Sequence, residues 1–162
     1  MPVVGLISDT HGLLRPDALA ALDGCDLLIH GGDIGPAEIL DALRERAPLT
    51  VVRGNNDTAA WARALPQRAI VDVDGVRICA VHDLKTLDID LRAESVDVVV
   101  SGHSHRPSST RRDGVLYVNP GSAGPRRFSL PISVARLDIH DGQVTPRIIQ
   151  LPTPLPGPAP KR

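Results

Sequence analysis

Short runs of apolar residues that end abruptly in polar residues recur along the chain. The clearest is the β-branched run at 98–100, which is followed by Ser101-Gly102 and then by His103 and His105. Such a run is typical of a strand that is buried on both faces. Because alternate residues of an extended chain project to the same side, the two imidazoles are predicted to reach one polar spot at the end of this strand.

Four earlier runs follow the same plan. They cover residues 3–7, 26–29, 49–52 and 76–81, and the potential metal ligands that follow them are, in order, Asp9, His11, Asp33, Asn55 and His82. In open α/β sheets, ligands bind beyond the carboxyl ends of the strands. Five strand ends that each deliver such a side chain therefore predict one shared site.

The segments between the first three runs have apolar residues at helical spacing. Residues 14–24 and 36–47 each carry a proline near the start, and a glycine or a proline marks where each segment stops. Strand and helix alternate at spacings that favour parallel βαβ units. A further short helix is predicted around Trp61, within residues 58–65.

From residue 67 onward the pattern changes to strands joined by tight turns. Asp74-Gly75 separates residues 69–73 from 76–78, and Asp141-Gly142 separates the last two predicted strands. Dipeptides of this kind predict two-residue hairpins. A mixed α/β fold of two packed mixed β-sheets flanked by helices, a four-layer αββα sandwich, accounts for both halves of the chain.

Length and composition predict one domain over residues 1–151. Residues 152–162 contain five prolines and are expected to form an extended, mobile tail. The sequence shows neither a basic leader with an apolar segment nor a membrane span, so a cytoplasmic location is expected. Cys25 and Cys79 lie in apolar surroundings and are expected to be buried, reduced thiols.

The charge balance bears on the choice of partner. The net charge is −1, and the chain has one Trp, one Tyr and one Phe. A nucleic-acid polymer is therefore an unfavourable partner, because side chains that neutralise phosphates and stack on bases are both scarce. The oligomeric state stays open, since exposed sheet edges could pair across a two-fold axis into a homo-oligomer.

The separate motifs are weak, because Gly-Asp and Gly-Asn pairs are also common in turns. Together and in order, they resemble the motifs of the calcineurin-like metallophosphoesterases, carried here by Asp9-x-His11, Gly32-Asp33, Gly54-Asn55, His82 and Gly102-His103-x-His105. The Gly-Asn-x-Asp form at 54–57 and the Asn-Pro-Gly-Ser block at 119–122 resemble the small bacterial and archaeal phosphodiesterase branch. That branch includes the retromer scaffold subunit Vps29, and the resemblance covers residues 3–150.

This resemblance implies a site for two divalent metal ions. One ion would be held by Asp9, His11 and His105, the other by Asn55, His82 and His103, and Asp33 would bridge them. Mixed carboxylate, imidazole and amide ligands favour Mn²⁺, with Fe, Zn²⁺ or Ni²⁺ as alternatives. The implied reaction is hydrolysis of a small-molecule phosphodiester through attack by a metal-bridging hydroxide, with Asp33 and Asn55 among the catalytic residues.

Two positions depart from the wider family. Many members have a histidine directly after the asparagine ligand, where it protonates the leaving group, but this chain has Asn56, which is no acid at neutral pH. Relatives usually follow the fourth-motif histidine with glycine and a second histidine, whereas Asp83-Leu84 follows His82 here. The first departure predicts weaker protonation of the leaving group, and the second predicts a different geometry of the loop after His82.

Two further residues have two interpretations each. Asp57 either orients a histidine through a carboxylate–imidazole hydrogen bond, as a catalytic residue, or caps the turn. Arg127 either reaches a substrate phosphate or belongs to a basic surface pair with Arg126. Asn56 is a second candidate for substrate binding, and His30 is assigned to packing or support rather than to metal ligation.

Two other classes of function share this fold and site. A non-catalytic scaffold or interaction protein would have no need for the ligands, yet all seven positions carry side chains that can bind metal. A nucleotide sensor would keep the ligands and lose turnover, which Asn56 leaves open. Turnover on diester and monoester substrates separates these classes.

Overall fold

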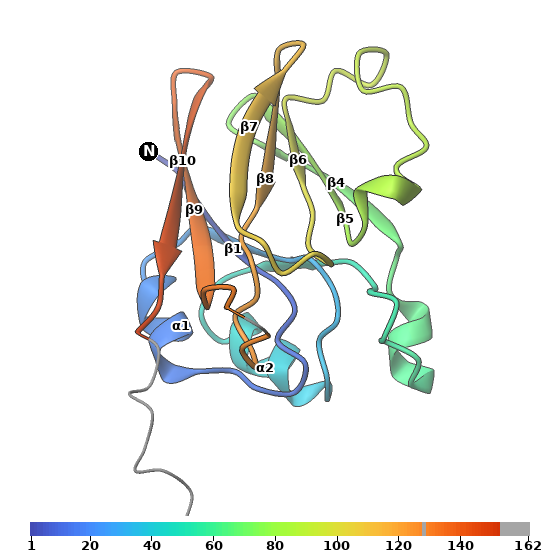
Figure 1. Cartoon of the computed structure of the whole chain (residues 1–162). Helices are drawn as coiled ribbons and strands as arrows, with labels where there is room; N and C mark the ends of the chain where they lie inside the picture. Colours follow the sequence, from blue (N-terminus) through green and yellow to red (C-terminus); the bar gives the residue numbers. More distant parts are fainter. Residues whose placement is uncertain (128, 153–162) are drawn as a thin grey trace, which may run out of the picture.

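Two five-stranded β-sheets lie face to face in the computed structural model, which describes residues 1–127 and 129–152 (Figure 1). The first sheet has the order β10-β9-β1-β2-β3, and the second has the order β4-β5-β6-β8-β7. The first consists of β1 (Val3–Ile7), β2 (Leu27–His30), β3 (Leu49–Val51), β9 (Ser133–His140) and β10 (Gln143–Gln150). The second consists of β4 (Arg68–Val73), β5 (Val76–Val81), β6 (Val98–Val100), β7 (Ser108–Arg112) and β8 (Val115–Asn119).

Parallel pairing joins the strands that precede the predicted ligands. Strand β1 pairs in parallel with β2, and β2 with β3, as the alternation of strands and helices predicted. In the second sheet, β5 pairs in parallel with β6, and β6 with β8. Because parallel neighbours end on the same side, the ligand-bearing loops of each sheet emerge together.

The predicted hairpins form at Asp-Gly turns. Asp74 has a φ of 51° and Gly75 a φ of 82°, and these residues join β4 to β5. Asp113-Gly114 and Asp141-Gly142 also have positive φ at both positions. Positive φ at both central residues is the geometry of the type I′ turn, whose twist matches that of paired strands.

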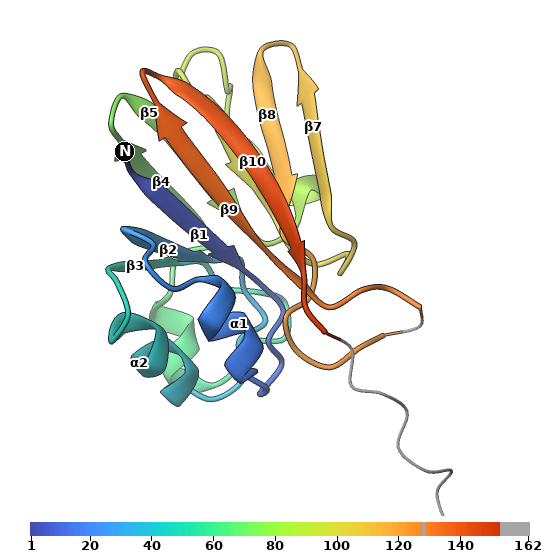
Figure 2. The same ribbon diagram turned by 90° about the vertical axis from the view of Figure 1, so that its left-hand side faces the viewer.

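Helices cover the outer face of the first sheet (Figure 2). They are α1 (Pro16–Ala21) and α2 (Glu38–Arg44), both shorter than the predicted segments. Their apolar sides, including Ala18 and Leu43, pack with Leu28 and Ile7 of the sheet. The segment around Trp61 forms a 3₁₀ helix, η1 (Ala60–Ala64), which packs against the same cluster.

The outer face of the second sheet is covered mainly by a loop. A single 3₁₀ turn, η2 (Leu84–Thr86), precedes Leu87, Ile89 and Leu91, which pack against buried residues of β5 and β6. These three apolar residues alternate with polar ones, and a period of two suits extended chain rather than helix. The two-sheet sandwich is confirmed, and its fourth layer is this largely non-helical segment.

The sheets enclose an apolar core between them, with Leu6 and Ile29 from the first sheet and Ile78 and Val100 from the second. Cys25 and Cys79 are buried free thiols, and burial raises the pKa of each. Beyond Pro152, the predicted proline-rich tail lies outside the described residues. Within the described ranges, no helix has the length and apolar character needed to cross a membrane.

Candidate metal centre

Loops from the ends of β1, β2, β5 and β6 are joined by backbone hydrogen bonds. The N–H of Asp9 donates to the carbonyl of Gly32 (3.0 Å), and the N–H of His11 donates to the carbonyl of Asp33 (2.9 Å). The N–H of Gly102 donates to the carbonyl of His82 (2.9 Å), which ties the loop after β6 to the loop after β5. The predicted convergence of strand ends is thus fixed by the main chain.

Five of the seven predicted ligands have left-handed backbone conformations. The φ values are 54° for Asp9, 44° for His11, 59° for Asp33, 70° for His103 and 62° for His105. Such values are uncommon outside glycine, although Asp and His are among the residues that tolerate them. Strained backbone of this kind concentrates at functional sites, where the surrounding structure holds it in place.

Two glycines allow the loops to approach one another closely. A Cβ atom on Gly54 would collide with the backbone nitrogen and a carboxylate oxygen of Asp33. A Cβ atom on Gly102 would collide with Ser8 Oγ and lie 2.6 Å from Asp9 Oδ2. Side chains larger than hydrogen at these positions would therefore displace the predicted ligands.

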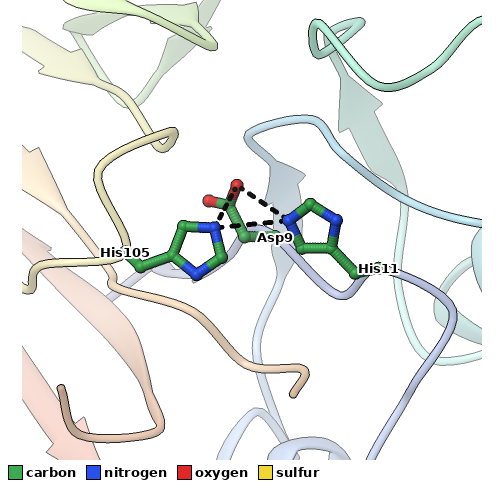
Figure 3. Close-up of side chains that lie close together, drawn as sticks. All are labelled: Asp9, His11 and His105. Atoms are coloured by element: carbon green, nitrogen blue, oxygen red, sulfur yellow. Dashed lines mark hydrogen bonds and ion pairs between the residues drawn. The ribbon is translucent and has the colours of Figure 1, made fainter. Parts of the chain in front are cut away.

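One group of three side chains converges on a single spot (Figure 3). Oδ1 of Asp9 lies 3.6 Å from Nε2 of His11 and 3.4 Å from Nε2 of His105, and these two nitrogens are 3.3 Å apart. Three potential ligand atoms that face one another at this spacing can hold one divalent cation. This is the group that the family resemblance assigns to the first ion.

The two oxygens of Asp9 have different surroundings. Oδ2 accepts hydrogen bonds from Ser8 Oγ (2.7 Å) and from the N–H of His103 (3.1 Å). Oδ1 is buried and has no hydrogen-bond partner among the described residues. A buried carboxylate oxygen without a partner is costly unless a cation neutralises it, so the donor set fits a metal ion.

A second group forms around Asp33 and His82. Oδ2 of Asp33 lies 3.2 Å from His82 Nε2 and 3.7 Å from His11 Nε2, so it stands between the two sets of imidazoles. His103 Nδ1 lies 3.3 Å from His82 Nε2 and 3.2 Å from Asn55 Oδ1. The structure thus brings all seven predicted ligands together. Asp33 lies between the two sets, and Oδ1 of Asp9 lies 4.0 Å from His82 Nε2, so Asp9 also belongs to the second group.

Contacts behind the centre orient the imidazole rings. Nδ1 of His82 donates a hydrogen bond to the carbonyl of Gly31 (2.7 Å), which directs Nε2 of the same ring toward Asp33. On the outer side, Nε2 of His103 lies 3.8 Å from Oδ2 of Asp83. Asp83 is one of the departures from the family pattern, and it supplies a carboxylate beside His103.

The protonation states follow from burial and hydrogen bonding. Burial disfavours the charged form of Asp33, but hydrogen bonds from His82 and from the N–H of Asn56 outweigh it and hold the pKa of Asp33 at about 2. Burial lowers the pKa of His105, which favours the neutral imidazole that binds metal. The centre therefore combines an ionised carboxylate with a neutral histidine at physiological pH.

His30 lies behind the centre and supports it, as predicted. Burial lowers the pKa of His30 to about 4, so the ring is neutral. Its Nδ1 accepts the N–H of Gly32 (3.0 Å), and its Nε2 lies 3.1 Å from Thr10 Oγ1, which donates to the carbonyl of Ile34 (2.6 Å). Sequence reasoning missed Ser8 and Thr10; the signal was the pair of small hydroxyl residues flanking Asp9 at a buried strand end.

Asp57 accepts hydrogen bonds from three main-chain N–H groups. Its Oδ2 accepts the N–H groups of Asp33 (2.9 Å) and Gly54 (2.7 Å), and its Oδ1 accepts the N–H of Ile34 (2.8 Å). The expected carboxylate–imidazole hydrogen bond is not formed within the described ranges, and both oxygens accept hydrogen bonds from main-chain donors instead. These contacts are those of the capping alternative, and a catalytic role of Asp57 stays a prediction.

The two predicted substrate contacts have different surroundings. The backbone N–H of Asn56 donates to Asp33 Oδ1 (2.8 Å), and Asn56 Nδ2 donates to Asp33 Oδ2 (3.1 Å), so this residue supports the shared ligand. Arg127 is exposed, and its positive charge adds to the effect of burial in lowering the pKa of His105. A substrate contact from Arg127 stays a prediction.

The Asn-Pro-Gly-Ser block holds the loops from behind. Asn119 Nδ2 donates to the carbonyl of Gly102 (3.0 Å) and to Ser104 Oγ (3.1 Å). Ser122 Oγ donates to the carbonyl of Asp9 (3.0 Å). These bonds link the strand end at β8 to the loops that carry the first group of ligands.

Comparisons with known proteins agree with the ordered motifs. A probable metallophosphoesterase of Methanocaldococcus jannaschii is 34% identical over 152 residues, which cover 86% of this chain and 77% of that protein. Phosphodiesterase YfcE of Escherichia coli K12 is 27% identical over 161 residues, covering 81% of this chain and 84% of the enzyme. The structure of Chaetomium thermophilum Vps29 is similar in fold, with a TM-score of 0.75 at 19% identity over 93% of this chain and 98% of Vps29.

The family model extends this similarity over most of the sandwich. The model of the calcineurin-like phosphoesterase superfamily domain matches residues 3–142, a stretch that includes every predicted ligand. It runs from the start of β1 to the turn before β10. The chain therefore belongs to the calcineurin-like phosphoesterase superfamily.

Proposed function

We propose that this protein is a dinuclear metal-dependent phosphodiesterase that hydrolyses a small-molecule phosphodiester. The observation that carries the proposal is the buried Oδ1 of Asp9, which faces imidazole nitrogens and has no hydrogen-bond partner in the described part of the chain. Two divalent ions held here would lower the pKa of a shared water and offset negative charge on the phosphoryl group. The phosphodiesterase named among the relatives supports a diester substrate.

The ligand sets divide as the resemblance implies. Asp9, His11 and His105 would hold one ion, and Asp33 would be shared with a second ion at His82. His103 and Asn55 complete the second set at its exposed side, where the His103 side chain is 46% exposed. Oxygen and imidazole donors in this mixture favour Mn²⁺, with Fe, Zn²⁺ and Ni²⁺ as alternatives.

The remaining residues position these ligands. Ser8 and the N–H of His103 hold one oxygen of Asp9, which turns the other toward the imidazoles. The main-chain N–H of Asn56 donates to Oδ1 of Asp33 and its side-chain amide donates to Oδ2, so both oxygens of Asp33 are held in place. Positioning of this kind keeps a centre ready for reaction without reorganisation in the transition state.

A metal-reconstitution assay tests the proposed activity. Chelator-stripped protein should regain activity when Mn²⁺ is added, and it should hydrolyse bis-p-nitrophenyl phosphate in preference to the monoester p-nitrophenyl phosphate. Tight metal binding without turnover on either substrate would contradict the proposal and would indicate a scaffold or a nucleotide sensor. Turnover that is unaffected by chelation would exclude the metal-dependent mechanism.

Asn56→His is expected to raise turnover on diesters with poor leaving groups. The side chain at this position lies beside Asp33, and histidine would supply the proton donor that asparagine lacks. General acid catalysis contributes about a hundredfold or more in favourable cases, so we expect a rise in kcat of about tenfold on alkyl diesters. Activity on p-nitrophenyl esters, whose leaving group needs no proton, should change little.

Asn56→Ala is the matched control for that substitution. It removes the hydrogen bond from Nδ2 to Asp33 without adding an acid. A rise in turnover with both variants would mean that the bond to Asp33, rather than proton donation, limits the rate. Equal turnover of Asn56→His and the wild type on alkyl diesters would mean that another group or water already protonates the leaving group.

A further inference from the structure

We propose that Arg53 binds a second anionic group of the substrate, a phosphoryl or carboxylate group on the ester that is retained after cleavage. This inference rests on the proposed function and names the class of substrate. It begins from a cavity of about 290 Å³ that opens beside the metal centre. The residues that line it include Asn55 and His82, two of the predicted ligands, together with Arg53, Gln67, Asp83 and Thr86.

The position of the cavity indicates which part of a substrate would occupy it. Because Asn55 and His82 belong to both the cavity and the second ligand set, a group in the cavity lies next to a phosphoryl group bound at the centre. The volume lies near the lower end of the range for small-molecule pockets, which suits one substituent of a diester. A larger cavity of about 680 Å³ is lined by residues of the 89–97 and 112–117 segments and contains no predicted ligand.

Arg53 supplies positive charge to this cavity. It is half-buried, and its backbone N–H donates to the carbonyl of Pro66 (2.8 Å), which fixes the main chain at the end of β3. Within residues 1–127 and 129–152, its guanidinium forms neither a hydrogen bond nor an ion pair. A partly buried guanidinium gains most from a carboxylate or phosphate, which it can bind through two parallel hydrogen bonds.

Asp83 is the acidic residue of the cavity, and its carboxylate is already engaged. Oδ1 accepts the N–H of Lys85 (3.0 Å), and Oδ2 lies 3.8 Å from Nε2 of His103. These contacts turn the negative charge toward η2 and the metal centre. The remaining lining groups, Gln67 and Thr86, are neutral and polar, so Arg53 sets the charge preference.

Matched substrates test this preference. Four p-nitrophenyl phosphodiesters share a leaving group and differ in the retained ester: n-butyl, 3-carboxypropyl, 2-phosphoethyl and the cationic 2-(trimethylammonio)ethyl group. We expect kcat/KM of the Mn²⁺-loaded wild type to be at least about tenfold higher for the two anionic esters than for the butyl ester. A difference in kcat/KM between the carboxypropyl and phosphoethyl esters would show which of the two anionic groups the subsite prefers. A preference for the cationic ester would overturn the proposal.

Arg53→Gln should remove the preference for anionic esters, mainly through a higher KM, and should change kcat/KM for the butyl ester less than about twofold. Arg63→Gln is the matched control, because Arg63 carries the same charge but does not line the cavity with His82 and Asp83. Arg63 lines a second cavity of about 170 Å³, which Arg53 and Asn55 also line. The wild-type preference should persist in that variant. An equal loss in both variants would show a general effect of positive charge and would overturn the role of Arg53.

Calorimetry separates this subsite from catalysis. Mn²⁺-loaded protein should bind 3-phosphonopropionate more tightly than propylphosphonate by about tenfold, and Arg53→Gln should abolish the difference. Discrimination in binding without any turnover would contradict the proposed function and leave the subsite in place. Turnover on the butyl ester without discrimination by the wild type, in binding or in catalysis, would support the proposed function and overturn the subsite.

Discussion

Replacing Asp33 with alanine is expected to remove both metal ions and to lower kcat/KM for bis-p-nitrophenyl phosphate by at least about a thousandfold. Oδ2 of Asp33 stands 3.2 Å from His82 Nε2 and 3.7 Å from His11 Nε2, so one substitution takes a ligand from both sets. Hydrogen bonds hold the pKa of this carboxyl at about 2, which keeps its charge available at any pH where the protein would work. Metal content after dialysis, measured by mass spectrometry, and kcat/KM are the two readouts.

Asp33→Asn removes the negative charge of the side chain and avoids the backbone strain that alanine would introduce. Asp33 has a φ of 59°, a conformation that asparagine tolerates far better than alanine. The asparagine variant should therefore keep the fold and still lose metal and activity. Asp88→Asn, at an exposed carboxylate paired with Arg68, should bind metal and turn over like the wild type. Near-normal turnover of the Asp33 variants would exclude a two-metal mechanism.

Much of the centre could be predicted because its ligands follow strands. A β-branched run such as residues 98–100 indicates a buried strand, and parallel strands end at the same side of a sheet. Those two rules place His82, at the end of β5, near His103 and His105, after β6, without any long-range information. The Asp-Gly turns are predictable for a similar reason, because few backbone conformations can join two strands through a two-residue hairpin.

Other parts of the fold are harder to predict from the local sequence. Strand β7 consists of Ser108–Arg112, all exposed, so no apolar alternation marks it, and its arginines suit an unprotected sheet edge. Residues 84–96 have apolar positions at period two and contain no helix beyond one 3₁₀ turn, so the expected fourth helical layer is largely loop. For β7, tertiary packing rather than local pattern decides the structure, whereas the segment after η2 follows its own period of two.

Asp57 shows most clearly what sequence spacing leaves out. Its motif suggested a partner among the histidines, yet two of its three donors lie on the 33–34 segment, which only the fold brings close. A main-chain N–H is common to all residues except proline, so no pattern of side chains indicates which of these groups will donate to a given carboxylate. The role of this carboxylate can therefore be inferred only from the arrangement of the loops in the fold.

Asp57→Ala is expected to lower the free energy of unfolding by about 3–9 kcal/mol, because it leaves three buried N–H groups without an acceptor, at about 1–3 kcal/mol each. That is a large share of the stability of a domain and corresponds to a fall in Tm of about 10 °C or more. Asp57→Asn keeps one acceptor oxygen and should show a smaller loss. Thermal denaturation should be followed in the presence of a chelator, because bound metal stabilises the folded state by mass action.

The chelator condition also distinguishes the two interpretations of Asp57. A carboxylate that caps Asp33, Ile34 and Gly54 stabilises the loops whether or not metal is bound, so the fall in Tm should persist when metal is removed. A carboxylate that acts on a metal ligand would affect stability only through metal binding. An Asp57→Ala protein with wild-type Tm in chelator and no turnover with Mn²⁺ would return Asp57 to catalysis and refute the capping role.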